Sequence, residues 1–369
     1  MKRMVRVLFV VASSKHAFIL KMIEHFSCEV ESMVVVPSYP YTSTRSRQGM
    51  MIEKVSGVLF GGGEVLEAIA KFKPTAIYSD SPLYGSQSKI LQRIAKQRIP
   101  TIVHLRGDLW REFFGWFQRS RPKAKLLGSA VYFNGMLGLL LADTITPICR
   151  WLEGEVLRHL PWKTTEVVYQ GVDPTVFFPD PGVGLGLEHP AAVIIQNHSV
   201  YQKTLGLLQF REVVARLPSV RFYIATGEDM VQRYLPLVRN AYSGLENVHF
   251  IAGIGHPSGV RSLLAASDLY VLPSCLDCCP TTILEASLME KPVLGSRVGG
   301  IPEIIRDGYT GWSIDNNNTE DWVNKIRMIV DDTGLSRRLG TQGRQWVCKN
   351  FAWPRIASQV ERILKEVET

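Results

Sequence analysis

Short apolar runs rich in valine and isoleucine alternate with helical patterns along most of this chain, and this alternation constrains the fold more than any other feature. In the first half, strands are expected at 5–12, 75–79, 100–104, 143–148 and 166–169. A second series is expected at 191–197, 220–226, 248–253, 269–273 and 292–296. Amphipathic stretches such as 85–98 and 205–217 lie between these runs. The pattern predicts βαβ units and therefore an α/β protein with parallel sheets.

The alternation stops at 171–190, where four prolines and four glycines disfavour both helix and strand. We therefore expect two Rossmann-like domains facing a cleft, at 1–175 and 190–350, as a length of 369 residues allows. Residues 351–369 are expected to form a helix that crosses back to the first domain. Its apolar positions lie on one helical face: Ile356, Val360, Ile363, Leu364 and Val367. In such sheets, ligands bind beyond the carboxyl ends of the strands.

Charge is distributed unevenly. The chain carries a net +8, but residues 1–165 contain 23 Lys/Arg and 12 Asp/Glu, which is +11, and the remainder is −3. This asymmetry predicts that the first half meets an anionic partner, either nucleic acid or an anionic membrane surface. A solvated basic face without a partner is the alternative interpretation.

The loop "PSCLDCCPTTILE" at 273–285 concentrates three of the six cysteines. A metal knuckle, a redox centre and a catalytic loop with incidental cysteines are the three readings. Cys275 and Cys278 form a single C-x2-C without a second pair at zinc-site spacing, so we expect no metal site. The cysteines are expected to be reduced and to serve as small residues in a tight loop.

The same loop and the segment after it resemble the donor-binding region of GT-B fold retaining glycosyltransferases of family 4, the glycosyl transferases group 1, of prokaryotic and archaeal type. The match runs in register over about forty residues. It comprises Pro273-Ser274, Asp277, Pro280, Leu284-Glu285-Ala286, Pro292-Val293, Gly299-Gly300-Ile301-Pro302-Glu303 and Asp307-Gly308 with Gly311. The segments 167–180 and 351–360 resemble the family's pre-linker segment and its closing helix.

The resemblance implies the roles of the donor-site residues. Asp277 would orient the hydroxyls of the donor sugar, and Glu285 would hold the ribose of the nucleotide. Lys203, with the helix start at Thr281 and Thr282, would neutralise the leaving diphosphate. The backbone of Gly253 and Ile254 would contact the base of the nucleotide.

Four positions depart from the family pattern. Asp277 replaces the usual glutamate and shortens the reach of the carboxylate by one methylene, and Cys278 replaces a glycine. The family's Gly-Arg pair, which holds phosphate, is Asn197-His198 here. Losing the arginine removes a bidentate phosphate contact, although His198 can still donate a hydrogen bond. Whether His198 weakens activity is not determined by the sequence.

In the first half, His104 follows a strand directly, in "PTIVHLRGDLW". A histidine alone at this place is more often a satisfied core residue. The family commonly has a histidine at the end of this strand, and the resemblance therefore implies a catalytic position beside the donor sugar, together with Asp277 and Lys203. Arg106 and Asp108 lie in the same loop and are the acceptor candidates.

Three N-terminal segments have more than one interpretation. The apolar run near the N-terminus is short for a signal peptide and is expected to be a buried strand. Three glycines at 61–63 precede a helical pattern and are expected to form a turn, although they could approach a phosphate. The apolar run 126–142 follows four basic residues and could be a buried helix, an interfacial helix on acidic lipid or a membrane-spanning helix.

Taken with the resemblance, the sequence predicts a metal-independent retaining hexosyltransferase of glycan biosynthesis, without a cofactor. The donor would be a UDP- or GDP-sugar, and the acceptor a lipid-linked or saccharide molecule rather than nucleic acid. We expect the protein in the cytoplasm or peripheral at the inner face of the cell membrane. The rivals are a non-catalytic nucleotide-sugar-binding protein and a GT-B sugar-nucleotide epimerase. The sequence does not identify the donor sugar, its base, the acceptor, the linkage position or the oligomeric state.

Overall fold

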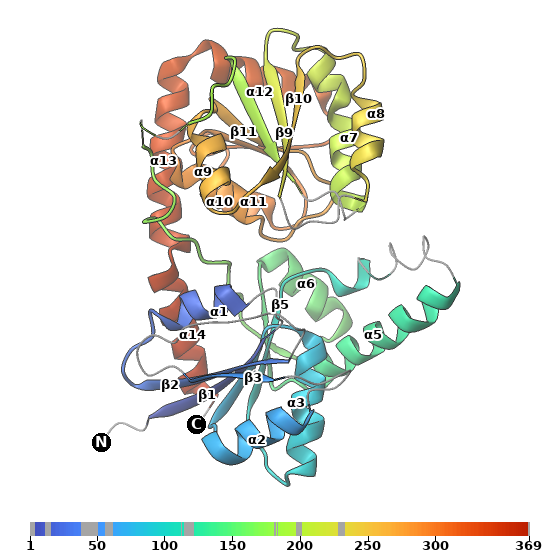
Figure 1. The fold of residues 1–369 in the computed structure, drawn as a ribbon, viewed down its shortest axis with the longest axis vertical. Coiled ribbons are helices and arrows are strands. Elements are labelled where there is room, and N and C mark those ends of the chain that lie inside the picture. Colours follow the sequence, from blue (N-terminus) through green and yellow to red (C-terminus); the bar gives the residue numbers. More distant parts are fainter. Residues whose placement is uncertain are drawn as a thin grey trace. The chain divides into compact units, whose positions relative to one another are not determined.

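The computed structural model divides into two compact units, each built on one sheet (Figure 1). The N-terminal unit comprises Met1–Gly171 and Trp353–Thr369, and the C-terminal unit comprises Val172–Ala352. The domain boundaries expected from the sequence, at 175, 190 and 351, are not tested by this division and stay predictions. The structure describes residues 4–11, 16–37, 51–55, 62–111, 113, 122–180, 182, 184–196, 201–227 and 233–367.

The sheet of the N-terminal unit has seven parallel strands in the order β3-β2-β1-β4-β5-β6-β7. Their bounds are β1 Val5–Val10, β2 Val30–Pro37, β3 Met51–Val55, β4 Ala76–Ser79, β5 Thr101–Leu105, β6 Thr144–Pro147 and β7 Thr164–Thr165. Its helices are α1 His16–Ile23, α2 Gly62–Phe72, α3 Pro82–Ile94, α5 Pro122–Leu141, α6 Arg150–His159 and, from the end of the chain, α14 Trp353–Glu366. This strand order is that of the Rossmann fold.

The C-terminal unit repeats the arrangement with six parallel strands in the order β10-β9-β8-β11-β12-β13. Their bounds are β8 Ala191–Ile195, β9 Arg221–Gly227, β10 Val248–Ile254, β11 Leu269–Leu272, β12 Val293–Ser296 and β13 Gly311–Ile314. The helices are α7 Tyr201–Ala215, α8 Leu235–Ala241, α9 Ser258–Ala265, α10 Thr281–Leu288, α11 Ile301–Ile304, α12 Thr319–Asp331 and α13 Thr333–Phe351. The order reverses between β8 and β11, which makes the gap between their ends the switch point of this sheet.

The predicted fold class is therefore confirmed as α/β, with two Rossmann-like units and a C-terminal helix that returns to the first of them. One expected strand is wrong: residues 166–169 follow the two-residue strand β7 without extending it. The amides of Glu166 and Val168 do bond to β6, but the amide side chain of Gln359 in α14 takes the carbonyl of Val167 at 2.7 Å. The ladder itself stops because β6 ends at Pro147, which has no N–H to donate back to this segment.

Helix α14 completes the core of the N-terminal unit. Its apolar face joins side chains of β1 and α1 in one buried cluster, and Ile356, Val360, Ile363 and Leu364 are each at most 3% exposed. The expected apolar face is thus confirmed. A helix with this spacing of apolar residues is stabilised chiefly by burying them against a partner surface.

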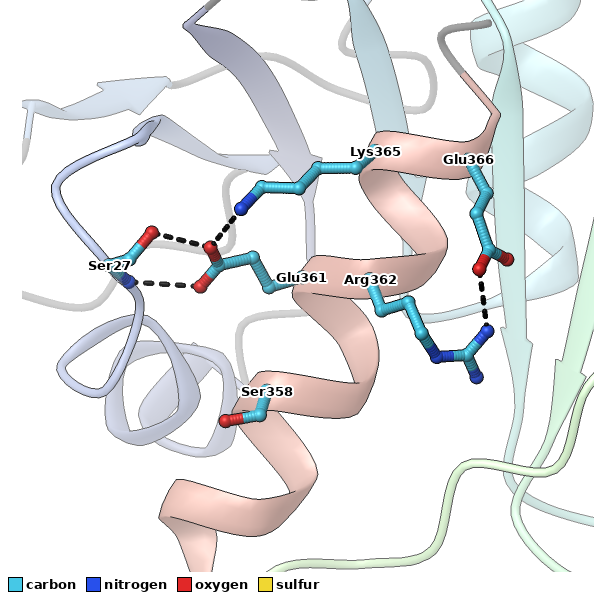
Figure 2. A pocket seen from close by; sticks show the side chains of 6 residues that line it. All are labelled: Ser27, Ser358, Glu361, Arg362, Lys365 and Glu366. Atoms are coloured by element: carbon cyan, nitrogen blue, oxygen red, sulfur yellow. Dashed lines mark hydrogen bonds and ion pairs between the residues drawn. The ribbon is translucent and has the colours of Figure 1, made fainter. Parts of the chain in front are cut away.

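Polar contacts hold the end of α14 beside the loop after α1, around a surface hollow of about 520 Å³ (Figure 2). The carboxylate of Glu361 accepts hydrogen bonds from the backbone and hydroxyl of Ser27 and, at 2.7 Å, from Lys365. Burial acts to raise the pKa of Glu361, but these hydrogen bonds outweigh it and lower the pKa below its ordinary value. The charged and polar groups of Ser27, Glu361 and Lys365 that line the hollow are therefore already hydrogen-bonded to one another.

Replacing Ile356 with alanine should destabilise the N-terminal unit by about 2–5 kcal/mol, because it deletes a buried side chain from the cluster around β1. The measurement is denaturant unfolding of the whole chain. The adjacent Arg355 is exposed on the same helix, and Arg355→Ala should change stability little. Equal effects of both substitutions would contradict the assigned role of α14.

Candidate functional site

The ends of four strands meet at the switch point of the C-terminal sheet and hold the loop that carries Asp277. After β8, the side-chain amide of Gln196 donates to the carbonyls of Lys203 and Pro273, at 2.9 and 3.2 Å. After β11, the backbone amide of Ser274 donates to the hydroxyl of Ser296 on β12 at 2.8 Å. After β13, Asn316 donates to the carbonyl of Ser274 at 2.9 Å. The loop after β11 is thereby fixed on both sides.

Close backbone approaches also shape this loop. Gly299 has a φ of +54°, and a Cβ there would lie 2.0 Å from the carbonyl oxygen of Asp277. The next amide, of Gly300, donates to that same carbonyl at 3.1 Å. Only glycine fits at position 299, which is the physical reason for the Gly-Gly pair noticed in the sequence.

Lys203 and Asp277 form an ion pair at this edge, with 2.6 Å between Nζ and Oδ2. Lys203 lies in the first turn of α7, and Asp277 lies 74 positions later in the loop after β11. The carboxylate is only 10% exposed. The structure therefore brings two of the residues predicted for the donor site into direct contact, with opposite charges that neutralise each other when no ligand is bound.

Helix α10 begins at the same loop with Thr281, after Pro280 in an extended conformation. The first amides of a helix have no acceptor within it and make its N-terminus a favourable place for an anion. The hydroxyl of Thr282 accepts a hydrogen bond from the buried Tyr270 at 2.7 Å, which holds the first turn against β11. Thr281 and Thr282 thus form the start of the helix that follows the loop after β11, and their role in donor binding stays a prediction.

Glu285 is buried one turn further along α10, and its side chain is only 5% exposed. Oε1 lies 3.0 Å from Nε2 of His256, while Oε2 is buried and has no hydrogen-bond partner among the described residues. A buried carboxylate oxygen without a donor is unfavourable, because its hydrogen bonds to water have been lost and no hydrogen bond within the protein replaces them. Such an atom indicates that a ligand group donates to it.

The loop after β10 reaches the same carboxylate. Gly253 and Ile254 end that strand, where the pairing with β9 shifts register and Gly253 takes a φ of +71°. His256 follows two residues later and bonds to Glu285. The predicted base-binding backbone and the predicted ribose-binding carboxylate are therefore neighbours.

Sequence reasoning gave no binding role to His256 or Tyr270. For His256 a signal existed, namely a polar residue just after a strand of a parallel sheet. The hydrogen bond to Glu285 raises the pKa of His256 above its ordinary value, against the opposing effect of burial. The remaining donor candidate, His198, lies outside the described residues, as does Asn197.

The cysteines of the loop form no disulfide among the described residues, and most of them are buried. Cys278 and Cys279 are buried, and burial raises the pKa of Cys275, whose thiol donates to Gln209 at 3.3 Å. A raised thiol pKa disfavours the reactive thiolate. Within the described part of the chain, no group of three or more His, Cys, Asp or Glu side chains could hold a metal ion.

In the N-terminal unit, His104 ends up buried between neighbouring strands. It is 4% exposed, its Nδ1 lies 3.1 Å from the hydroxyl of Thr146, and its ring stacks on Tyr78. Burial, helped by the charge of Arg106, lowers the pKa of His104 to about 3. The imidazole is therefore neutral at ordinary pH, as expected if His104 is a buried residue of the core. A role beside the donor sugar stays a prediction.

The two acceptor candidates make structural contacts in the same loop. Oδ1 of Asp108 accepts from the amides of Trp110 and Arg111, at 3.1 and 3.0 Å, and so caps the short helical turn there. The guanidinium of Arg106 lies over the ring of Phe18, 4.8 Å from its centroid. Acceptor binding by either residue remains a prediction, because these contacts do not test it.

Comparisons with known proteins agree with this geometry. The family described as "Glycosyl transferases group 1" matches residues 200–346, the stretch that carries Lys203, Asp277 and Glu285. Residues 200–346 are a group 1 glycosyltransferase domain. The recognised family and the enzyme class expected from the sequence are thereby confirmed at the level of this domain.

Named relatives extend the similarity beyond that domain. The chain is 28% identical over 252 residues to N-acetyl-alpha-D-glucosaminyl L-malate synthase of Bacillus anthracis, covering 66% of this chain and 65% of that protein. It is 26% identical over 273 residues to alpha-maltose-1-phosphate synthase of Mycolicibacterium smegmatis, covering 67% and 70%. The match thus spans about two thirds of each relative.

Solved structures show the same fold over nearly the whole chain. Sucrose-phosphate synthase of Thermosynechococcus elongatus superposes with a TM-score of 0.76 at 17% identity, covering 99% of both chains. HepE of Anabaena, solved in complex with UDP, gives 0.73 at 16% identity, covering 98% of this chain and 100% of that one. At these identities the comparison establishes the GT-B fold alone.

We expect His256 to titrate above the ordinary histidine pKa of about 6.5, because its charged form is bonded to Glu285. Its contribution to stability is then full below that value and is lost as the pH rises through the folded pKa. Histidine NMR titration measures this, and Glu285→Gln should lower the pKa.

His104 should behave in the opposite way, because its folded pKa is lowered to about 3. The unfolded chain takes up a proton at about 6.5 and the folded chain does not, so stability falls as the pH decreases from 6.5 toward 3. In His104→Gln, which retains a polar group for Thr146, the unfolding free energy should depend less on pH over this window. An unchanged pH dependence would refute the buried neutral state.

Proposed function

We propose that the protein is a retaining, metal-independent glycosyltransferase that moves a sugar from a UDP- or GDP-sugar to a lipid-linked or glycan acceptor. The reaction breaks the bond between the anomeric carbon and the diphosphate and forms one to an acceptor oxygen. The group 1 domain and the shared edge of Lys203, Asp277 and Glu285 support this proposal. HepE is described in complexes with UDP and with UDP-glucose, which favours a uridine donor.

The observation that carries the proposal is the unpartnered oxygen of Glu285. A ribose offers two adjacent hydroxyl donors, so one of them can satisfy Oε2 and recover the free energy lost by burying it. His256 holds the other oxygen and fixes the carboxylate in place. The backbone at Gly253 and Ile254 lies on the same side and can contact the attached base.

Positive charge for the leaving diphosphate would come from Lys203 and the N-terminus of α10. Negative charge builds on that diphosphate as the bond to the sugar breaks, and fixed donors aimed at it lower the barrier. The ion pair with Asp277 keeps Lys203 oriented in the meantime. When phosphate oxygens take over Lys203, Asp277 is released to accept from the sugar hydroxyls.

The loop after β5 in the N-terminal unit is the candidate for acceptor binding. The N-terminal unit carries Arg106 and Asp108 in the loop after β5, and His104 ends that strand. We propose this loop as the acceptor-facing part of the unit, with a cytoplasmic acceptor that is either a glycan or a lipid-linked sugar. The basic character of residues 1–165 suits an anionic acceptor.

Two other functions remain in competition. A non-catalytic nucleotide-sugar-binding protein is favoured by Asp277 in place of glutamate and by His198 in place of arginine. It would bind donor and neither transfer nor hydrolyse the sugar. A GT-B epimerase would change the donor sugar without an acceptor, so incubation with donor alone separates it from the transferase.

Thermal stability with a panel of nucleotide sugars tests the donor site, since a ligand that binds the folded state raises the melting temperature. One UDP- or GDP-sugar should shift the wild type. At millimolar donor, Lys203→Ala and Glu285→Gln should each lose most of the shift, in line with about 2 kcal/mol for a charged or buried hydrogen bond. Lys349→Ala, exposed on α13, is the matched control and should keep it. A full shift in all variants would place the donor elsewhere.

A further inference from the structure

Helix α5 is apolar on two opposite faces, and only one of them packs against its own unit. The packed face contains Gly135, Gly138, Leu139 and Ala142, all buried. At Gly138 a Cβ would lie 1.7 Å from the carbonyl oxygen of Pro82, so the helix backbone rests directly on the start of α3. Glycines on this face thus let two helices approach closely.

The opposite face of α5 is exposed although its residues are large and apolar. Phe133, Leu137 and Leu140 are 74%, 38% and 44% exposed, and their spacing of four and three residues places them in one stripe. Ala130 begins the stripe one turn earlier. A helix that is apolar all round is normally buried on all sides, so this face indicates a partner surface. Figure 1 shows α5 extending outward from the sheet of its unit.

Aromatic rings lie near one end of the stripe, and a tryptophan with a lysine lies near the other. Next to Phe133, Tyr132 stacks on Phe113 with ring centroids 4.1 Å apart. At the other end, the ammonium of Lys163 donates to the carbonyls of Leu140 and Ala142, at 2.7 and 2.6 Å. Its neighbour Trp162 is 69% exposed. Aromatic rings beside basic groups suit the boundary between lipid headgroups and acyl chains.

Charge distinguishes among the surfaces that could cover this face. Residues 1–165 carry a net +11, and the sequence places Arg119, Arg121, Lys123 and Lys125 at or just before the first turns of α5. A second copy of the chain would bring the same positive charge and be repelled. An anionic bilayer attracts it and also accepts the apolar side chains. No helix among the described residues is long and apolar enough to cross a bilayer.

We propose that the stripe Ala130, Phe133, Leu137 and Leu140 docks on an anionic lipid bilayer, with α5 lying in the plane of its interface. The side chains enter the headgroup region, and the net positive charge of residues 1–165 attracts the acidic headgroups. This surface is separate from the donor edge of the C-terminal unit, so the inference stands whether or not the proposed sugar transfer is correct.

Flotation of the full chain with vesicles tests the proposal without any enzymatic assay. Wild type should float with vesicles of phosphatidylcholine and phosphatidylglycerol at low salt, and with pure phosphatidylcholine much less. Raising the salt should weaken the binding, since screening acts on the charged part. Leu140→Glu should reduce the vesicle affinity by about tenfold or more, because it places a charge at the interface. Phe133→Glu should do the same.

Leu237→Glu is the matched control, because Leu237 is 43% exposed on α8 of the C-terminal unit, close to the 44% of Leu140. It should float like the wild type, and melting curves of all variants should agree with that of the wild type. Failure of the wild type to bind anionic vesicles, or full binding by Leu140→Glu, would overturn the proposal. Sedimentation velocity adds another decisive outcome: a dimer that Phe133→Glu dissociates would assign the stripe to a second copy instead.

Discussion

Parallel pairing of every strand in the C-terminal sheet is the constraint on which the donor edge depends. Parallel hydrogen bonding directs all carboxyl ends to one side, so loops that are far apart in the chain open at the same place. The order reversal between β8 and β11 leaves room there, because the two connections run away in opposite directions. Lys203 and Asp277 meet at that gap although 74 positions separate them.

The polar groups at this edge fall into two sets, those that are hydrogen-bonded within the protein and those that are buried without a donor. Gln196, Ser274, Ser296 and Asn316 bond to one another and to backbone, and they hold the loop rigid. The second set consists of acceptor oxygens that are buried without a donor among the described residues, namely Oε1 of Gln196 and Oε2 of Glu285. Acceptors left open within a loop that is otherwise held by hydrogen bonds are what a preorganised binding site requires, since ligand binding then costs little reorganisation.

The valine- and isoleucine-rich runs were sufficient to predict most strands, because fully buried parallel strands need such residues on both faces. Three strands were not predicted. β2 begins "VES", with charge and hydroxyl at its start, β3 is "MIEKV" with two charged residues, and β13 is only "GWSI". The error at 166–169 has another origin. The amides of Glu166 and Val168 bond to β6, but β6 ends at Pro147, which has no N–H to return a bond and continue the ladder. Which residue of a neighbouring strand lies opposite a segment is not visible in the local pattern of that segment.

The motif residues of the donor site could be named from the sequence, whereas their partners could not. Nothing near His256 in the sequence points to Glu285, and nothing near Gly299 points to the carbonyl of Asp277. The opposite faces of α5 illustrate the same limit. Periodicity shows that both faces are apolar, but only the packing of Gly138 on Pro82 decides which of them is left exposed.

The return of α14 to the N-terminal unit has a consequence for synthesis of the protein. Strand β1 and helix α14 share one core, although they lie at opposite ends of the described chain. The ribosome makes β1 before α14, and the side chains of α14 that cover β1 emerge only after the whole C-terminal unit has been translated. The C-terminal unit is continuous in sequence and can fold as it emerges. The first unit to be translated is thus the last to be completed, and its apolar surface needs protection during that interval.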